Sequence, residues 1–322
     1  MKSAKQTTLR DQIAVSGVGV HSGLPVTLTL NPARDDQGIV FRRVSADGSI
    51  EREIRADVRA VTATEFATVL GDASGPLCST AEHLLATLRG LYVDNVIVEI
   101  DGPEVPIMDG SAAAFVKAID QAGLTTRAQP RRFIEVIKPV RVSKDEAFGE
   151  LRPYEHGFRV EAEIEFDHPL IGKQAMALDI EPNSFRREIA PARTFGFMKD
   201  VAKLWSAGYA LGANFANTLV VSEDRVLNPE GLRFADEFVR HKVLDAIGDL
   251  ALAGLPLLAA YKTVRGGHKL NHSVLSALMA DQTAWRVVEA PAEPAHAPIR
   301  RMRGRADVAA GFAVAAYAPE VS

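Results

Sequence analysis

Cysteine is nearly absent from this sequence, which contains only Cys78 among 322 residues. A single thiol excludes an intrachain disulfide framework and a cysteine-rich structural zinc site, and it favours a reducing, cytoplasmic location. Residues 1–10 lack the apolar core of a signal peptide, and no apolar run reaches the length of a membrane span. We therefore expect peripheral contact with a membrane at most.

An excess of positive charge is absent too, since the formal net charge is −4. This balance argues against a general nucleic-acid binder, so no nucleic-acid partner is expected, although local basic residues can still bind a phosphorylated small molecule. The chain does contain 47% hydrophobic residues and is long enough for about two globular domains.

Hydrophobic periodicity predicts the same order of elements twice. Residues 12–70 alternate apolar and polar side chains between turn residues, as antiparallel strands do. A helix is expected over 79–90, where Ser79-Thr80-Ala81-Glu82 has the pattern of a capping box. A strand at 95–100 and a helix over 111–123 follow.

The polar segment 125–132 is the predicted domain boundary, because strand patterning restarts directly after it. The repeated order of sheet, helix, strand and helix predicts a duplicated α+β architecture in which the first helices of the two halves pack together. The second half has a strand at 158–166, a helix at 237–249, a strand at 257–263 and a helix at 273–284. The expected boundaries are 1–126, 127–288 and an irregular, proline- and arginine-rich tail at 289–322.

The helix over 237–249 carries the first chemical signal. It places His241, Asp245 and Asp249 along one face, opposite an apolar stripe. A solvated polar face is the ordinary explanation, but His and Asp are poor helix formers. An imidazole and a carboxylate one turn apart can also bind one metal ion, and a hydrolytic zinc site needs three such ligands and a water.

Glu82 and His83 are candidates for the groups that such a site still lacks. Taken alone, Glu82 fits the capping box and His83 fits an ordinary core or surface histidine. With His241 and Asp245, however, His83 completes a set of two imidazoles and one carboxylate, which suits zinc better than magnesium or calcium. Glu82 is then free to take a proton from the water.

Residues 265–272 form the third informative stretch. Gly266 and Gly267 predict a functional loop, so we expect His268 on a loop in a proton-transfer role, oriented by Asp249. If this stretch is helical instead, His268 and His272 have the spacing of a rival pair of metal ligands.

Together these stretches resemble the signature segments of the UDP-3-O-acyl-N-acetylglucosamine deacetylases. The resemblance runs from about Thr8 to Val288 and leaves the tail uncovered. Its six motifs are GVGVH at 17–21, STAEH at 79–83, PIMDGS at 106–111, ARTFGFM at 192–198, FVRHKVLDAIGD at 238–249 and RGGH at 265–268.

The resemblance implies a role for each matching residue. It implies a catalytic zinc ion, Zn2+, bound by His83, His241 and Asp245, with Glu82 as general base and His268 as general acid. Asp249 would support that acid, and the Thr194 hydroxyl would help to hold the tetrahedral oxyanion. The substrate-binding positions would be Lys242 and Arg265 near the sugar nucleotide, Phe166 near the uracil, and Phe195 and Met198 near the acyl chain.

The resemblance also implies a fold and a reaction. The fold would be a duplicated two-domain α+β sandwich, each domain a sheet packed on two helices, with the helices of the two domains facing each other. The reaction would remove the N-acetyl group from UDP-3-O-acyl-N-acetylglucosamine, the committed step of lipid A biosynthesis. The expected partner is this UDP-linked substrate, and the expected state is a monomer.

Residues 194–221 fall where the family inserts a β-α-β unit that forms a hydrophobic passage for the acyl chain, although ordinary core is the alternative for an apolar stretch. Two rival functions remain open. Another zinc amidohydrolase would act on a different N-acetyl sugar, against which Lys242 and Arg265 favour a nucleotide-linked substrate. A metal-stabilised binding module would need neither Glu82 nor His268.

Overall fold

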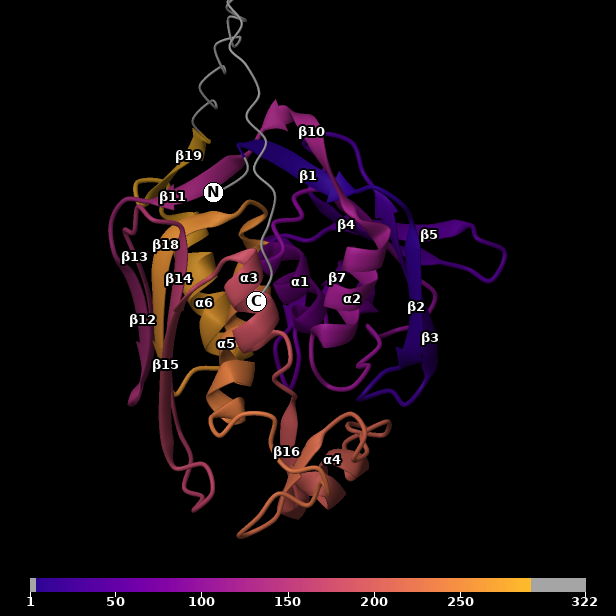
Figure 1. Ribbon diagram of the computed structural model, residues 1–322, viewed down its shortest axis with the longest axis vertical. Coiled ribbons are helices and arrows are strands. Elements are labelled where there is room, and N and C mark those ends of the chain that lie inside the picture. The colour runs from indigo at the N-terminus through magenta and orange to yellow at the C-terminus, as the bar shows by residue number, and fades with distance from the viewer. Residues whose placement is uncertain (1–3, 291–322) are drawn as a thin grey trace, which may run out of the picture. The chain divides into compact units, whose positions relative to one another are not determined.

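The first half of the chain is built on a five-stranded sheet (Figure 1). The computed structural model describes residues 4–290. The sheet has alternating buried residues, such as Val26, Leu28 and Leu30 in β3, because one face packs against helices. Its order is β2 (Ile13–Val18), β3 (Pro25–Pro32), β9 (Val96–Ile100), β4 (Ile39–Val44) and β5 (Ile50–Arg55).

The other elements of this half connect and cover that sheet. A small sheet contains β6 (Val61–Ala63), β7 (Val69–Asp72) and β8 (Gly75–Cys78), preceded by η1 (Val58–Ala60). The two helices are α1 (Glu82–Gly90) and α2 (Ala113–Ala122), and α2 packs against β2.

The second half repeats the plan with a seven-stranded sheet and two long helices, α5 (Glu237–Leu250) and α6 (His268–Ala280). Helix α5 packs on β14 and β15, and α6 packs on β12 and β13. The strands are β11 (Arg132–Val136), β12 (Val140–Lys144), β13 (Ala147–Arg152), β14 (Phe158–Glu165), β15 (Lys173–Asp179), β18 (Leu257–Val264) and β19 (Trp285–Glu289). Short helical turns are α3 (Pro182–Ser184), η2 (Phe185–Ile189) and η4 (Ala251–Ala253).

A β-α-β unit interrupts this half between the sheet and α5. It consists of β16 (Phe195–Phe197), η3 (Met198–Asp200), α4 (Val201–Ser206) and β17 (Leu219–Val221), and β16 pairs with β17 in parallel. We call residues 195–221 the insert. Figure 1 shows its strand β16 and helix α4 beyond the ends of α1 and α5.

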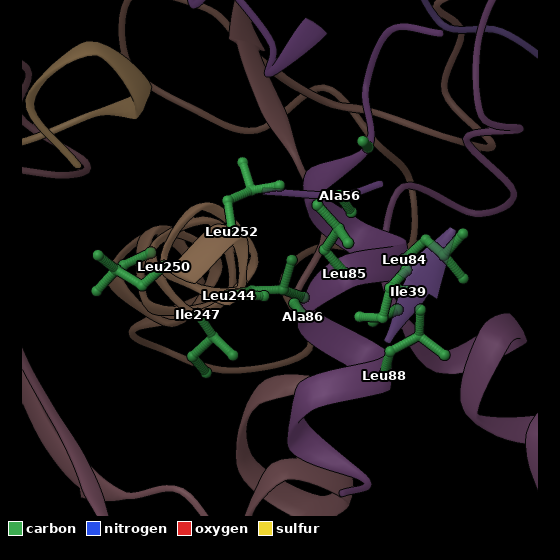
Figure 2. Packing of buried hydrophobic residues seen from close by; sticks show 14 of the residues in the cluster. Ile39, Ala56, Leu84, Leu85, Ala86, Leu88, Leu244, Ile247, Leu250 and Leu252 are labelled. Carbon is green, nitrogen blue, oxygen red and sulfur yellow. The ribbon is translucent and has the colours of Figure 1, made fainter. Parts of the chain in front are cut away.

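The helices of the two halves face each other through α1 and α5. Figure 2 shows Ala86 of α1 and Leu244 of α5 between the two helices, whereas Leu84 and Leu88 point away from α5 toward Ile39. All five side chains are buried, and each leucine contributes about 1.5–3 kcal/mol of hydrophobic stabilisation. The predicted α+β sandwich with facing helices is confirmed.

Three local predictions are wrong or incomplete. The capping box does not form, because α1 is preceded by Ala81 as its cap residue, the Ser79 amide donates to the Pro103 carbonyl, and the Glu82 carboxylate accepts from the Thr68 amide. The last helix begins at His268 instead of residue 273 and ends at Ala280. The segment expected to be a linker includes β10 (Leu124–Pro130), which pairs with β1 (Lys5–Leu9).

The domain boundaries at 126 and 288 stay predictions. The expected tail 289–322 lies outside the described residues from position 291 onward. No helix within residues 4–290 is long and apolar enough to cross a membrane.

Candidate metal centre

A buried cluster of two imidazoles and one carboxylate lies where α1 meets α5. His83 comes from the first turn of α1, and His241 and Asp245 lie one turn apart on α5. One candidate ligand atom from each residue lies within 4.8 Å of the others. His241 Nε2 and His83 Nε2 are 3.4 and 3.8 Å from Asp245 Oδ1. These separations leave space for one ion between the three side chains.

The imidazole of His241 is oriented by the backbone. Its Nδ1 lies 3.1 Å from the carbonyl oxygen of Ala192, so the ring donates there and turns the lone pair of Nε2 toward Asp245. The second oxygen of Asp245 accepts a 2.8 Å bond from Lys242 Nζ. The arrangement thus presents an unprotonated ring nitrogen of His241 and the charged carboxylate of Asp245 to the same point.

Electrostatics favour the protonation states that a metal requires. Burial lowers the pKa of His83 to about 3, with His241 adding to the effect, and burial also lowers the pKa of His241. Burial disfavours the Asp245 carboxylate, but Lys242 and His241 outweigh burial and lower its pKa. The cluster therefore consists of two neutral imidazoles and one carboxylate at neutral pH.

Glu82 lies beside the cluster on the same helix turn as His83. Its Oε2 accepts a 3.0 Å bond from the Thr68 amide, which fixes the carboxylate. Burial raises its pKa to about 7. A carboxylate with this pKa can accept and release a proton near neutrality, as a general base must.

His268 faces Glu82 from the other half, with its Nε2 3.9 Å from Glu82 Oε1. Its Nδ1 lies 2.9 Å from Asp249 Oδ2, and Asp249 also accepts from Thr68 Oγ1 at 2.5 Å and Asn271 Nδ2 at 2.8 Å. Burial disfavours the imidazolium, but Asp249 and Glu82 outweigh burial and raise the pKa of His268 to about 10. His268 is thus held as a proton donor.

Thr68 and Asn271 were not predicted from the sequence. Both hold Asp249 in place, and Thr68 also holds Glu82. Thr68 contacts Asp249 through its hydroxyl and Glu82 through its amide, and Asn271 is itself held by the Tyr261 hydroxyl at 2.7 Å. A lone threonine between strands carries no local signal. Asn271 lies one turn after His268, a spacing that becomes informative once the helix is known to begin there.

Several expected substrate-binding residues lie next to the cluster. The ring of Phe195 is 6.5 Å from that of His241, and Lys242 Nζ is 5.6 Å from the centre of the Phe195 ring. Phe166 packs against Phe195 at 5.8 Å. Thr194 is two residues beyond Ala192, and its amide donates to Gly110. Phe166, Phe195 and Lys242 therefore line one side of the site.

Arg265 and Met198 differ from this group. Arg265 forms ion pairs with Glu146 and Glu165, and none of its bonds within residues 4–290 reaches the cluster. Met198 is 53% exposed on the insert, beside a cavity of about 450 Å³ that Phe197 and Val221 also line. Trp205 of the insert is 58% exposed, and its indole donates to the carbonyl of Ala210.

The rival pair of histidine ligands is not assembled. Although both histidines lie on α6, His272 Nε2 contacts the carbonyl of Val58 at 3.4 Å and the hydroxyl of Ser276. His268 instead pairs with Asp249. The loop position expected for His268 is wrong, because extended Gly267 caps α6 and makes His268 its first residue.

The facing helices α1 and α5 bring together two histidines, one aspartate and a glutamate with a raised pKa, and α6 adds a carboxylate-bound histidine. This is the arrangement expected of a metal-dependent hydrolase. A family model described as UDP-3-O-acyl N-acetylglycosamine deacetylase matches residues 6–280. The chain belongs to this family.

The names of individual relatives agree with that of the family model. Proteins named UDP-3-O-acyl-N-acetylglucosamine deacetylase from Brucella ovis, Brucella canis and Brucella melitensis are each 48% identical to this chain over 289 residues. Each alignment covers 89% of this chain and 100% of the relative.

Proposed function

We propose that this protein hydrolyses the N-acetyl group of UDP-3-O-acyl-N-acetylglucosamine, releasing acetate and UDP-3-O-acyl-glucosamine, the committed step of lipid A biosynthesis. Family membership supports the substrate, and the geometry supports the chemistry. The observation that carries the proposal is that Glu82 and His268 lie on the two halves of the chain, 3.9 Å apart, beside the cluster of His83, His241 and Asp245.

The cofactor we propose is zinc, held by His83, His241 and Asp245. The three side chains fit it because they converge without hydrogen bonding to one another and offer two nitrogens and one oxygen. Three protein ligands leave one coordination position open, as in catalytic zinc sites. When bound, zinc would lower the pKa of a water toward ~7 and polarise the acetamide carbonyl.

The protein side chains then move the protons. Glu82 removes a proton from the water as a carbon–oxygen bond forms at the acetamide carbonyl. The Thr194 hydroxyl helps to hold the resulting oxyanion. His268, charged and held by Asp249, gives its proton to the nitrogen as the carbon–nitrogen bond breaks, so that the amine leaves neutral.

The substrate-binding residues of this proposal all lie in the second half of the chain. Lys242 contacts the sugar nucleotide and Phe166 the uracil, while Phe195, Met198 and the cavity beside the insert take the acyl chain. Arg265 serves the nucleotide only after exchanging its present partners Glu146 and Glu165 for phosphate. Domains at 1–126 and 127–288, a cytoplasmic location and a monomeric state complete the proposal.

Acetate release from UDP-3-O-acyl-N-acetylglucosamine by the purified protein tests this function. We expect release that a chelator abolishes and added zinc restores. Equal release from free N-acetylglucosamine derivatives would favour another amidohydrolase. Absence of release from a fully metal-loaded protein, together with a fourth protein ligand on the metal, would favour a binding module.

A further inference from the structure

Glu104 is a buried carboxylate that the proposed chemistry does not use. It is 1% exposed and forms no ion pair within the described range 4–290. Its oxygens accept bonds from the His21 amide at 3.0 Å, the Ser22 amide at 2.8 Å and the Thr80 hydroxyl at 2.8 Å. Burial of a carboxylate without a cation is costly, so these three donors are what hold it in place.

The amides that Glu104 holds belong to a loop that binds the insert. The carbonyls of Val20 and His21 accept from the Gly212 and Leu211 amides at 3.0 and 3.1 Å, and His21 Nδ1 accepts from the Ala210 amide at 3.3 Å. Three consecutive residues of the insert are thus hydrogen-bonded to residues 20–21 of the first half.

The contact between this loop and the insert is close enough to require glycine. A Cβ atom on Gly212 would lie 2.2 Å from the Gly19 carbonyl oxygen, and one on Gly19 would lie 2.2 Å from Glu104 Oε2. Glu104, the Gly19 backbone and the Gly212 backbone therefore form a continuous contact from the first half to the insert.

The third donor connects Glu104 to the candidate metal centre. Thr80 is two residues before Glu82 and three before His83, and it has a φ of 56°. This left-handed conformation is rare for a β-branched residue, so it persists only where other contacts hold it. The bond to Glu104 is the side-chain contact that does so.

We propose that Glu104 is a positioning residue that couples the insert to the Glu82–His83 turn, so that one buried carboxylate sets both the preference for acyl-chain length and the placement of the general base. The proposal rests on the deacetylase function and on the insert as the acyl-binding element. Its physical basis is that loss of the carboxylate frees the loop at 19–22 and the Thr80 turn together.

The variant Glu104→Gln tests the coupling in the full-length, zinc-loaded protein. The amide nitrogen of glutamine cannot accept, so one of the bonds to His21 or Ser22 is lost. We expect hydrogen exchange of the Leu211 and Gly212 amides to accelerate about tenfold. KM for a long-chain substrate should rise about tenfold more than KM for a short-chain analogue. The kcat should fall for both, because a neutral amide holds the Thr80 hydroxyl less firmly than the carboxylate does.

Two further variants separate the two arms of the coupling. Gly212→Ala should accelerate exchange at Leu211 and raise only the long-chain KM, leaving kcat for the short-chain analogue unchanged. Thr80→Val should lower kcat equally for both substrates without changing exchange in the insert, and Thr80→Ser, which keeps the hydroxyl, is its matched control. These two variants decide the question if Glu104→Gln does not fold.

Unchanged exchange at Leu211 and Gly212 in Glu104→Gln would overturn the proposal, as would a kcat effect of Thr80→Ser equal to that of Thr80→Val. Failure of the proposed function gives a different result, because the wild-type protein would then release no acetate. The exchange measurement needs no turnover and still decides whether Glu104 holds the insert.

Discussion

Glu82 and His268 have pKa values that burial and neighbouring charges displace in useful directions. Burial raises the pKa of Glu82 to about 7, whereas Asp249 and Glu82 overcome burial and raise that of His268 to about 10. Between these values Glu82 is deprotonated and His268 is protonated. The pair can therefore act as base and acid in the same pH range.

The pH profile of kcat/KM follows from these two groups. A general base works deprotonated, so activity should rise as the pH passes about 7. A general acid works protonated, so activity should fall as the pH passes about 10.

Glu82→Gln should keep the metal, remove the rise of the pH profile near pH 7 and lower turnover by roughly 100-fold or more. His268→Ala should remove the fall of the pH profile near pH 10. Loss of the metal from this variant would instead show that His268 is a metal ligand.

The cluster at the candidate metal centre was predictable because helical spacing is local. His241 and Asp245 follow from one turn of helix, and His83 from its place at the start of another. The capping box failed for a reason that the sequence does not show. The Ser79 amide donates to the Pro103 carbonyl and the Glu82 carboxylate accepts from the Thr68 amide, so partners from other elements replace those of the capping box.

At the scale of elements, the contact between α1 and α5 sets the geometry of the site. A Cβ atom on Gly248 of α5 would lie 2.1 Å from the carbonyl oxygen of Glu82. The absence of a side chain at this point therefore lets the two helices approach at the turn that carries Glu82 and His83.

Gly248→Ala tests this close approach. Alanine in a helix interior is normally about 1 kcal/mol more favourable than glycine, but here overpacking should destabilise the protein by about 1–3 kcal/mol and reduce zinc content. Urea unfolding and metal analysis measure both effects. Lys117→Ala, at an exposed position of α2, is the control for alanine in a helix. A stabilised Gly248→Ala variant would show that α1 and α5 can separate at no cost.

The insert provides a second prediction at this scale. Met198 is 53% exposed, so Met198→Asp should fold and keep zinc. Each buried methylene of an acyl chain contributes up to about 0.8 kcal/mol, and a charge beside the chain opposes that burial. We expect a larger rise in KM for a long-chain substrate than for a short-chain analogue. Met198→Leu should leave both values unchanged, and an equal rise for both substrates would place the acyl chain elsewhere.

Element boundaries were predictable where periodicity was strong, as in β14 and β18. The predictions were wrong where glycine serves both loops and helix caps, and where a strand pairs with a distant segment. Gly266 and Gly267 were expected to prolong a loop, yet extended Gly267 caps α6 and places His268 on a rigid helix. The polar segment at 125–132 was expected to be a linker, but its partner strand β1 comes from the other end of the half and gives no local signal.

At the scale of the whole molecule, the proposed metal would join the two halves of the chain. Of its three ligands, His83 lies in α1 of the first half, while His241 and Asp245 lie in α5 of the second. A metal that binds only the folded state stabilises it, by about 2.7 kcal/mol when the free ion is 100 times its Kd.

Removal of the metal should therefore lower the melting temperature as well as the activity. We expect a chelator to lower the Tm and added zinc to restore it. His83→Ala, His241→Ala and Asp245→Ala should each contain little zinc and melt at the same temperature with or without it. Calorimetry and metal analysis on the same samples measure this. Full zinc occupancy in any one variant would remove that residue from the ligand set.

The exposure of Trp205 has a practical consequence for optical spectroscopy. The sequence contains two tryptophans. Trp205 lies on α4 and is bonded to Ala210 in the insert, whereas Trp285 lies in β19 opposite Val136. Because indole fluorescence depends on the surrounding water, Trp205 is a label-free reporter at the insert. In a Trp285→Phe background its emission alone would report, in real time, the arrival and departure of the acyl chain that we propose to bind there.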